Sequence, residues 1–551
     1  MLPDLWYRNA VVYSLDLETF QDSDGDGCGD FEGLSRRLDY LESLGITTLW
    51  LGPFQPSPNR DNGYDISDYY GVDPRYGSLG DFVEFLHEAR SRGIRVIMDL
   101  VVNHTSDRHP WFREARRSTE STFHDWYVWS KKRPPNWQSG MVFPGVQERT
   151  WTRAQEVGKH YFHRFYEFQP DLNMENPEVR EEVRRIMGFW LALGVAGYRL
   201  DAVPFILEKP SKDGRTHPLR FEYLEEMRRF LQWRVGDAVL LGEANVLPEE
   251  ARRYFSERGG LHLMFNFWVN QHLFFALASG DARPLGAALR ATRRLPATAQ
   301  WAQFLRNHDE LDLGRLADEQ RAAVFERFGP EERMQLYGRG LRRRLAPMLG
   351  ERKRLELAYS LMFSLPGTPV LYYGEEIGMG EDLTLRERES VRTPMQWSAE
   401  PNAGFSTADK PVAPVVSDGP YGYEHVNVDR QRRDPDSLLR FITRLIRLRT
   451  ECPEIGWGDW KPVPTRSPHV LAILYRWRGS AVLCVHNFDE QPHEVTLRLE
   501  DEAARRLVDL IHEEHSDADR SGRHRLALEA HGYRWFSVGT PDPSPRRRTD
   551  A

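Results

Sequence analysis

Residues 82–102, FVEFLHEARSRGIRVIMDLVV, contain the repeating unit that decides the fold. Apolar side chains recur in this stretch with the spacing of a helix, at Phe82, Phe85, Leu86 and Ala89. Gly93 then supplies a helix stop signal, and the apolar run RVIMDLVV (95–102) follows as a predicted strand. A second one-sided helix over 179–193 ends before Gly194 and leads into the short run GYRLD (197–201). Alternation of this kind is typical of a parallel sheet covered by helices.

Eight apolar runs of strand type alternate with such helices along most of the chain. They are VVYSL (11–15), TTLWLG (47–52), RVIMDLVV (95–102), GYRLD (197–201), VLLGE (239–243), HLMFNF (262–267), FLRN (304–307) and PVLYYG (369–374). Eight strands favour a closed barrel over an open sheet. The sequence therefore predicts the α/β class, with a (β/α)8 TIM barrel.

Two stretches depart from a minimal barrel and predict further domains. Residues 104–176 are aromatic and rich in turns, which indicates a B domain inserted after the third strand of a barrel made of 1–103 and 177–459. From about residue 460 to 541 the pattern changes to short alternating runs, which predict a C-terminal antiparallel β domain. Residues 542–551 are expected to form a flexible tail.

Composition excludes several classes of protein. The net charge of -8 gives no basic surface for nucleic acid, and no apolar run is long enough to span a membrane. Cys28, Cys452 and Cys484 are too few for a disulfide framework or a zinc site. No signal peptide is visible, so we expect a cytoplasmic protein. A homo-oligomer remains possible.

Polar residues stand where the predicted strands end: Asp99, Asn103, His104, Arg199, Asp201, Glu243, Asn307, His308 and Asp309. A barrel gathers its chemistry at this face. A single acid is most often a solvated surface group, but Asp201, Glu243 and Asp309 each directly follow an apolar run. Arg199 lies two residues before Asp201, so both point to one face and the arginine can keep that carboxylate ionised.

Paired carboxylates suit the cleavage of a glycosidic bond. One protonates the leaving oxygen while the other attacks or stabilises the sugar cation, and a third acid can bind the sugar hydroxyls. The distance between the two carboxyl groups decides between retention and inversion. Spacing in the sequence does not give that distance, so both outcomes stay open at this step.

The same residues lie in segments that resemble the α-amylase family (family 13) of glycoside hydrolases. The segments are DLVVNHTS (99–106), QPDLN (169–173), GYRLDAVP (197–204), GEAN (242–245), RNHDE (306–310) and GTPVLYYGEEIG (367–378). The resemblance implies retention through a covalent glucosyl-enzyme, with Asp201 as nucleophile, Glu243 as acid/base and Asp309 as transition-state stabiliser. It also implies that three residues hold the sugar ring and the nucleophile: His104, Arg199 and His308.

The resemblance extends to the expected sugar subsite. Tyr64, in GYDISDY (63–69), matches a stacking platform beneath the glucose ring. Asp65 with Arg392, in VRTPMQW (391–397), matches a charged pair found in members that act on small α-glucosides. Such a pair binds the hydroxyls of a terminal sugar. It predicts an exo-acting enzyme with a pocket rather than an endo-acting α-amylase.

The segment DSDGDGCGD (22–30) predicts a cation site. Alternating carboxylates in a glycine-rich loop suit a hard cation, although Gly33 stands where an EF-hand needs a bidentate Glu. The loop resembles the single Ca²⁺ (or Mg²⁺) loop of α-glucosidases, which implies as ligands Asp22, Asp24, Asp26, Asp30 and the carbonyl of Cys28. A likeness to trehalose synthases suggests a second site at Asn103, Asp171 and Glu208. Both metals would be structural; a solvated acidic turn is the alternative.

Within the family the chain is most similar to trehalose-synthase and α-glucosidase members, with departures around the expected pocket mouth. VPFILEKPSKDGRTHPLRF (203–221) and the stretch 132–150 differ, and Gly314 replaces a carboxylate. An isomerase must retain the released glucose and exclude water. We therefore predict that hydrolysis or transfer to another acceptor outweighs the interconversion of maltose and trehalose. A trehalose synthase is the alternative, and a catalytically silent barrel used for binding is a further one.

Overall fold

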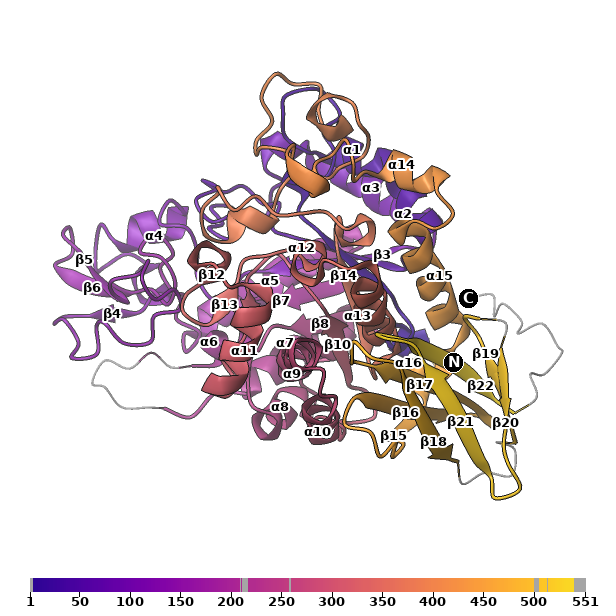
Figure 1. The fold of residues 1–551 in the computed structure, drawn as a ribbon. Coiled ribbons are helices and arrows are strands. Elements are labelled where there is room, and N and C mark those ends of the chain that lie inside the picture. The colour runs from indigo at the N-terminus through magenta and orange to yellow at the C-terminus, as the bar shows by residue number, and fades with distance from the viewer. Residues whose placement is uncertain are drawn as a thin grey trace.

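Eight parallel strands form a closed barrel in the computed structural model, which describes residues 3–208, 210, 217–256, 259–499, 505–512 and 514–539 (Figure 1). Their order around the barrel is β1-β14-β10-β9-β8-β7-β3-β2. The strands are β1 (Val12–Leu15), β2 (Thr48–Leu51), β3 (Arg95–Leu100), β7 (Gly197–Leu200), β8 (Val239–Gly242), β9 (Leu263–Phe265), β10 (Gln300–Phe304) and β14 (Thr368–Tyr372). The predicted TIM barrel is confirmed.

Helices cover the outside of this barrel. They are α1 (Phe31–Arg36), α2 (Leu38–Leu44), α3 (Leu79–Ser91), α5 (Pro177–Leu193), α6 (Val203–Leu207), α7 (Glu222–Arg234), α8 (Pro248–Phe255), α9 (Phe267–Ser279), α10 (Arg283–Ala291), α11 (Asp318–Phe328), α12 (Leu345–Leu349) and α13 (Arg352–Ser364). The buried face of α3 consists of Phe82, Phe85, Leu86 and Ala89. Helix α5 ends at Gly194, which adopts the left-handed conformation with φ 116°.

The inside of the barrel is packed with side chains rather than open. Trp50, Phe265 and Phe304 meet there with branched residues from the other strands. Filling by bulky side chains from successive strands is typical of this fold. The barrel is therefore a solid support, and its chemistry is confined to the loops at the strand ends.

The seventh barrel strand lies earlier in the chain than predicted. Strand β10 covers Gln300–Phe304, so FLRN (304–307) is mostly the loop that follows it. Gln300 and Gln303 are buried in this strand, and both make hydrogen bonds to backbone carbonyls. These polar residues interrupt the apolar pattern that would have identified the strand. As a result, Asp309 lies on a loop rather than directly after a strand.

The segment between β3 and β7 extends from the barrel as a separate lobe (Figure 1). It contains α4 (Pro110–Ala115) and a three-stranded antiparallel sheet of β4 (Trp129–Ser130), β5 (Trp151–Ala154) and β6 (Lys159–Phe162). A smaller sheet of β11 (Leu311–Asp312), β12 (Gln335–Leu336) and β13 (Gly340–Leu341) follows β10.

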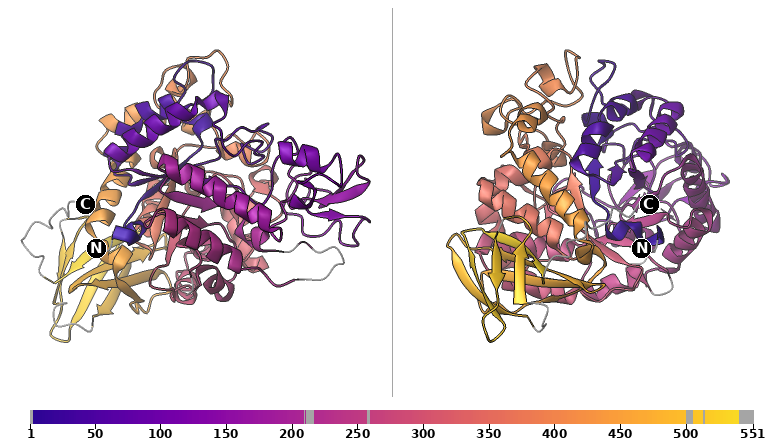
Figure 2. Two further views of the ribbon diagram at one scale, coloured as in Figure 1. Left: turned by 180° about the vertical axis from the view of Figure 1, so that it is seen from behind. Right: turned by 90° about the vertical axis from the view of Figure 1, so that its right-hand side faces the viewer.

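The last part of the described chain forms two antiparallel sheets beside the barrel, on the side away from β4–β6 (Figure 2). The strands are β15 (Asp459–Pro462), β16 (Val470–Trp477), β17 (Ser480–Asn487), β18 (His493–Arg498), β19 (Arg506–Asp509), β20 (His515–Asp517), β21 (Arg523–Leu528) and β22 (Tyr533–Val538). Three helices precede them: α14 (Val428–Arg433), α15 (Leu438–Glu451) and α16 (Pro453–Trp457). The predicted C-terminal β domain is confirmed, while the predicted tail, 542–551, lies outside the described residues.

In the part of the chain that the structure describes, no helix is both long and apolar enough to cross a bilayer.

Candidate active site

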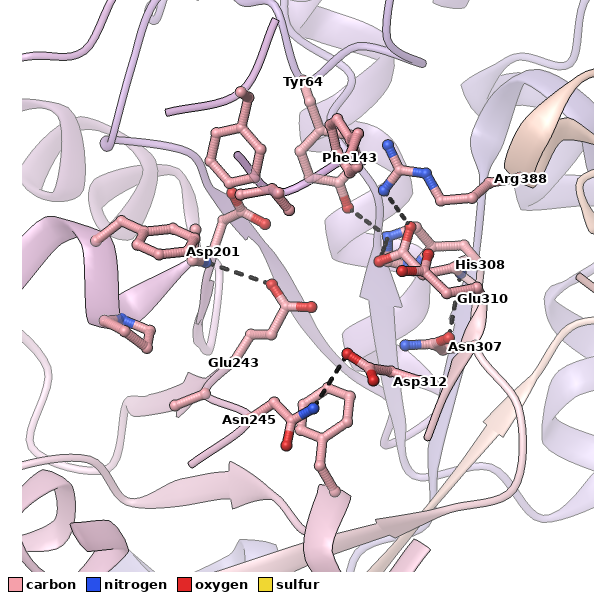
Figure 3. A pocket seen from close by; sticks show the side chains of 18 of the residues that line it. Tyr64, Phe143, Asp201, Glu243, Asn245, Asn307, His308, Glu310, Asp312 and Arg388 are labelled. Carbon is pink, nitrogen blue, oxygen red and sulfur yellow. Dashed lines mark hydrogen bonds and ion pairs between the residues drawn. The ribbon is translucent and has the colours of Figure 1, made fainter. Parts of the chain in front are cut away.

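The carboxylates predicted from the strand ends converge on one pocket of about 310 Å³ (Figure 3). Asp201 directly follows β7 and Glu243 directly follows β8, its neighbour in the barrel. Ala202, between Asp201 and α6, has φ 48°, a left-handed conformation that costs energy for a residue with a side chain. Its amide donates a hydrogen bond to Glu243 Oε2 at 3.3 Å. The turn after β7 therefore fixes the two carboxylates relative to each other.

One buried guanidinium joins the acids at the pocket floor. Arg199 Nη1 lies 2.6 Å from Asp201 Oδ1, and Nη2 lies 2.8 Å from Glu243 Oε2. Nη1 also lies 3.4 Å from Asp99 Oδ1 on the adjacent strand β3, where Asp99 and Arg199 are register partners. Only 1% of the Arg199 side chain is exposed. A single cation thus faces three carboxylates.

The pKa values of the two acids are separated in a useful order. Burial raises the pKa of Asp201 to about 6, although Arg199 opposes the shift. Burial also raises the pKa of Glu243, to about 7, with Arg199 again opposing and the charge of Asp201 adding to the rise. Near neutral pH Asp201 is mostly ionised and Glu243 retains much of its proton. One group is then suited to attack and the other to donate a proton.

Asp309 lies in a more cationic environment. Its Oδ1 is 2.7 Å from Arg388 Nη1 and 3.0 Å from Arg392 Nη2. Burial by itself raises the pKa of Asp309, but His308 and the two guanidiniums outweigh burial and hold it well below its usual range. Asp309 is therefore ionised throughout the working pH range and can accept hydrogen bonds from sugar hydroxyls.

Tyr64 and His308 form a flat wall of the pocket. Their rings are stacked with centroids 5.7 Å apart, and the Tyr64 hydroxyl lies 2.9 Å from His308 Nε2. The same hydroxyl donates to Asp99 Oδ2 at 2.6 Å. His104 also lines the pocket, 3.1 Å from the Tyr64 carbonyl through Nε2, and burial lowers its pKa to about 4. The structure thus brings Tyr64, His104 and His308 together as predicted.

Asp65 and Arg392, the charged pair predicted for the pocket, do not line it in the structure. Asp65 is buried outside the pocket lining, where its carboxylate accepts hydrogen bonds from Ser57 and the Arg60 amide. Arg392 donates to the His308 carbonyl at 2.8 Å and to Asp309, so it positions the loop after β10.

Asp61 and Arg388, each four residues earlier, form the pair that lines the pocket. Asp61 Oδ1 lies 3.2 Å from Arg388 Nη2, while Nη1 of the same arginine binds Asp309. In the sequence, Asp61 lies two residues before the segment GYDISDY and Arg388 lies three residues before VRTPMQW. Asp61 lies in an irregular loop and Arg388 in a short 3-10 helix, Glu387–Val391. Neither has a periodicity that indicates which side chains point inward.

Aromatic and polar residues surround the outer part of the pocket. Phe143, from the lobe between β3 and β7, lines it together with Phe165 and Phe205. The pocket mouth is formed by five polar residues: Asn245, Glu310, Asp312, Arg315 and Arg339. None of the five was predicted as a site residue: Asn245 and Glu310 end the segments GEAN and RNHDE, and the other three lie outside the quoted segments.

The pocket mouth retains a carboxylate despite Gly314. Asp312 Oδ2 accepts a hydrogen bond from Asn245 Nδ2 at 3.1 Å and lies 3.5 Å from Arg339 Nε. A Cβ at Gly314 would meet Asp312 Oδ1 at 2.9 Å and Arg339 Cδ at 3.2 Å. The glycine therefore makes room for Asp312 and Arg339, both of which line the pocket.

The loop 22–30, which is predicted to hold a metal and is called the metal loop below, brings Asp22, Asp24 and Asp30 together. One carboxylate oxygen from each lies within 4.8 Å of the others. Gly25 and Gly27, with φ of 86° and 96°, allow the tight turn between them. Hard oxygen donors at this spacing fit Ca²⁺ or Mg²⁺. Asp26 is not in this group; its carboxylate accepts a hydrogen bond from the Cys28 amide at 2.7 Å.

Glu208, one of the residues predicted for a second metal site, already forms an ion pair with an arginine. Asp171 Oδ2 accepts a hydrogen bond from Asn103 at 3.2 Å, and Oδ1 accepts the Arg164 amide at 2.8 Å. The Arg164 guanidinium lies 2.5 Å from Glu208 Oε2. An arginine in this position repels a divalent ion, so these residues do not fit the predicted second metal.

Comparison with known proteins gives consistent matches. The model of the α-amylase catalytic domain matches residues 17–328 and 342–458, and that of the sucrose hydrolase-like C-terminal domain matches residues 479–537. A trehalose synthase from Pimelobacter is 40% identical over 98% of this chain and 97% of its own length. One from Thermus thermophilus is 43% identical over 97% of this chain, which spans 56% of that longer protein. The solved trehalose-6-phosphate hydrolase of Bacillus licheniformis superposes with a TM-score of 0.78 at 30% identity, covering 97% of this chain and 100% of its own.

Proposed function

The chain belongs to the α-amylase family of glycoside hydrolases, and from this premise we propose that it is a retaining, exo-acting enzyme. Its substrates are the terminal α-glucosyl units of short α-glucosides such as maltose, trehalose or sucrose. The observation that carries the proposal is the shared guanidinium of Arg199, which holds Asp201 and Glu243 side by side while burial gives them different pKa values.

The first step breaks the glycosidic bond. An ionised Asp201 oxygen attacks the anomeric carbon, and the protonated Glu243 gives its proton to the leaving glycosidic oxygen. The products are a glucosyl ester on Asp201, a free sugar or alcohol, and an ionised Glu243. Arg199 contacts both carboxylates, so it stays paired as negative charge moves from Asp201 to Glu243.

The second step releases the glucose. Glu243 takes a proton from water or from the hydroxyl of an acceptor sugar, whose oxygen attacks the anomeric carbon and displaces Asp201. Each step inverts the anomeric carbon, so the product keeps the α configuration. Asp309 is ionised in both steps and accepts hydrogen bonds from sugar hydroxyls. These hydrogen bonds strengthen as the ring flattens toward its cationic transition state.

The exo preference follows from the Asp61–Arg388 pair. Both side chains line the pocket, are nearly buried, and lie 3.2 Å apart. Arg388 also binds Asp309, so the pair connects the subsite wall to a catalytic acid. A charged pair in this position binds the hydroxyls of a terminal glucose and fills the space that a longer chain would need.

We further propose that the metal loop holds one structural Ca²⁺, or Mg²⁺ in its place. Asp22, Asp24 and Asp30 supply three carboxylate oxygens, and Asp26 and the Cys28 carbonyl are the remaining proposed ligands. Such an ion neutralises the loop and joins it to the segment around Ser406, which binds Asp22 at 2.5 Å. The proposed mechanism needs no metal.

A product profile tests the proposal. The purified chain is incubated separately with maltose, trehalose, sucrose and maltooligosaccharides blocked at the non-reducing end, and products are followed by NMR. We expect α-configured products from at least one disaccharide and none from the blocked substrates. β-Glucose as the first product, or rapid cleavage of the blocked substrates, would contradict the proposal.

A second candidate is the interconversion of maltose and trehalose. It is favoured by the polar pocket mouth, where Asn245, Asp312 and Arg339 are linked by short contacts and can retain a released glucose. In the NMR experiment this function gives disaccharide conversion with little free glucose. Dominant free glucose would instead support hydrolysis, the outcome predicted from the sequence.

A further inference from the structure

Two histidines and an aspartate lie together where the C-terminal β domain meets the barrel. They are His469 just before β16, Asp489 just after β17, and His493 at the start of β18. One possible ligand atom from each lies within 4.8 Å of the others. None of the three residues lines the active-site pocket, so the catalytic chemistry does not account for them.

Both imidazoles direct the same ring nitrogen at the same oxygen. His493 Nε2 lies 2.7 Å and His469 Nε2 lies 3.8 Å from Asp489 Oδ2. The two rings are stacked, with centroids 4.9 Å apart and planes 28° apart. Tetrahedral zinc with bonds of about 2.0–2.2 Å needs ligand atoms separated by roughly 3.3 Å, and each of the two histidine–aspartate separations differs from that by about half an ångström.

A contact outside the cluster sets the state of His469. Its Nδ1 lies 2.7 Å from the carbonyl of Gly280, which caps the C-terminus of α9 in the barrel. A carbonyl only accepts hydrogen bonds, so Nδ1 carries the proton and Nε2 keeps its lone pair in the neutral ring. This is the arrangement in which a second partner orients a metal-binding imidazole.

The cluster is built on a fixed backbone. The Phe488 amide donates to the His469 carbonyl at 2.9 Å, which joins the two ligand-bearing segments. The Ala282 amide donates to the Pro468 carbonyl at 2.8 Å, which ties the His469 segment to the barrel. The ligands therefore need little ordering when an ion binds.

Two other carboxylates near the cluster are paired with arginines, so the three proposed ligands are the groups that face the metal position. Asp281 lies close to His469 but is held by Arg283 at 2.6 Å. Glu490 is held by Arg327 and Arg354. Asp489 remains as the carboxylate that faces both imidazoles, and its side chain is 26% exposed, so an ion can reach it.

We propose that His469, Asp489 and His493 form a binding site for one zinc-like divalent transition metal, at the edge of the C-terminal β domain that contacts the barrel. Two imidazoles and one carboxylate with a fourth position for water are a common ligand set for Zn²⁺ and do not suit Ca²⁺. The bound ion replaces the proton between His493 and Asp489. It acts on stability, because the cluster shares no residue with the pocket.

Zinc binding to the full chain tests this site. Isothermal titration calorimetry with Zn²⁺ as the titrant, in the presence of excess Ca²⁺, should show one tight site per chain. His469→Ala and His493→Ala should each weaken it by at least about tenfold. The matched control, His87→Ala, removes an exposed histidine of α3 and should leave binding unchanged. Zinc should also raise the melting temperature of the wild type and not of the two variants.

Asp489→Asn keeps the shape of the ligand and guards against misfolding in the alanine variants. It should melt cooperatively and bind zinc at least about tenfold more weakly. Anomalous diffraction at the zinc edge should place one peak between the three side chains. Equal zinc affinity in the wild type and the Asp489→Asn variant, or a peak only at other residues, would overturn the proposal.

Discussion

The active site and the metal loop each contain a group of three carboxylate side chains, and the surroundings of the two groups differ. In the active site, Asp201, Glu243 and Asp309 are balanced by the guanidiniums of Arg199, Arg388 and Arg392. In the metal loop, Asp22, Asp24 and Asp30 accept hydrogen bonds chiefly from backbone amides. Within the described ranges, no Lys or Arg forms an ion pair with these three aspartates.

The difference explains two functions for the same residue type. Fixed cations oppose the rise in pKa that burial causes and stay paired as charge moves from one active-site carboxylate to another during the reaction. Backbone amides hold the loop aspartates in place but leave their net charge uncompensated. A cluster of the first kind is suited to chemistry, and one of the second kind is suited to an added cation.

The largest expected effect comes from removing one carboxylate charge in the active site. Asp201→Asn keeps the shape of the nucleophile and removes its charge, so kcat should fall by about 10⁴-fold or more. Hydrolysis of an aryl α-glucoside measures it, with circular dichroism as the check on folding. Activity within about tenfold of the wild type would exclude Asp201 as the nucleophile.

The next effect tests one of the balancing cations. Arg388→Gln leaves Asp61 and Asp309 without their shared partner, so kcat/KM on maltose should fall by about 100-fold. The ratio of activity on maltohexaose to activity on maltose should rise, because the charged pair no longer closes the subsite. Arg386→Gln, an exposed neighbour two residues away, is the matched control and should change neither value.

Removing the cation tests the metal-loop half. Chelation with EDTA should lower the melting temperature by a few degrees, and added Ca²⁺ should restore it. Asp24→Asn should reduce this response, whereas Asp418→Asn, at an exposed position on another loop, should keep it. A wild type that melts identically with EDTA and with Ca²⁺ would show that the loop needs no ion.

The smallest expected effect is a narrow pH optimum. Asp201 must be ionised, so kcat/KM should fall as pH drops below about 6. Glu243 must be protonated, so it should also fall as pH rises above about 7. Rates on maltose measured from pH 4 to 9 should give this bell. A rate that stays flat through pH 8.5 would contradict the raised pKa of Glu243.

The sequence predicted the barrel and much of its chemistry because these features repeat or follow strands. Asp201 and Glu243 each directly follow a short apolar strand, so the fold itself places them at the reactive face. Strand β10 was displaced in the prediction because Gln300 and Gln303 are buried by pairing with backbone carbonyls, which no hydropathy pattern reveals.

The charged pair of the pocket was predicted at the wrong residues for a different reason. The pocket pair was expected at Asp65 and Arg392, and the structure has it at Asp61 and Arg388. Both pairs lie outside the α-helices and strands, where the direction of a side chain depends on tertiary contacts rather than on spacing. Arg164 had a similar effect at the expected second metal site, since a distant loop brings its guanidinium to Glu208.

The central claim is that Asp201 forms a covalent bond to glucose while Glu243 acts as the general acid and then the general base. A slow fluorinated α-glucosyl fluoride should trap this intermediate, and mass spectrometry of the digested protein should locate it. We predict one fluoroglucosyl group per chain, on the peptide that contains Asp201. An adduct on the peptide of Glu243 or Asp309, or steady turnover of the reagent with no adduct, would contradict the account.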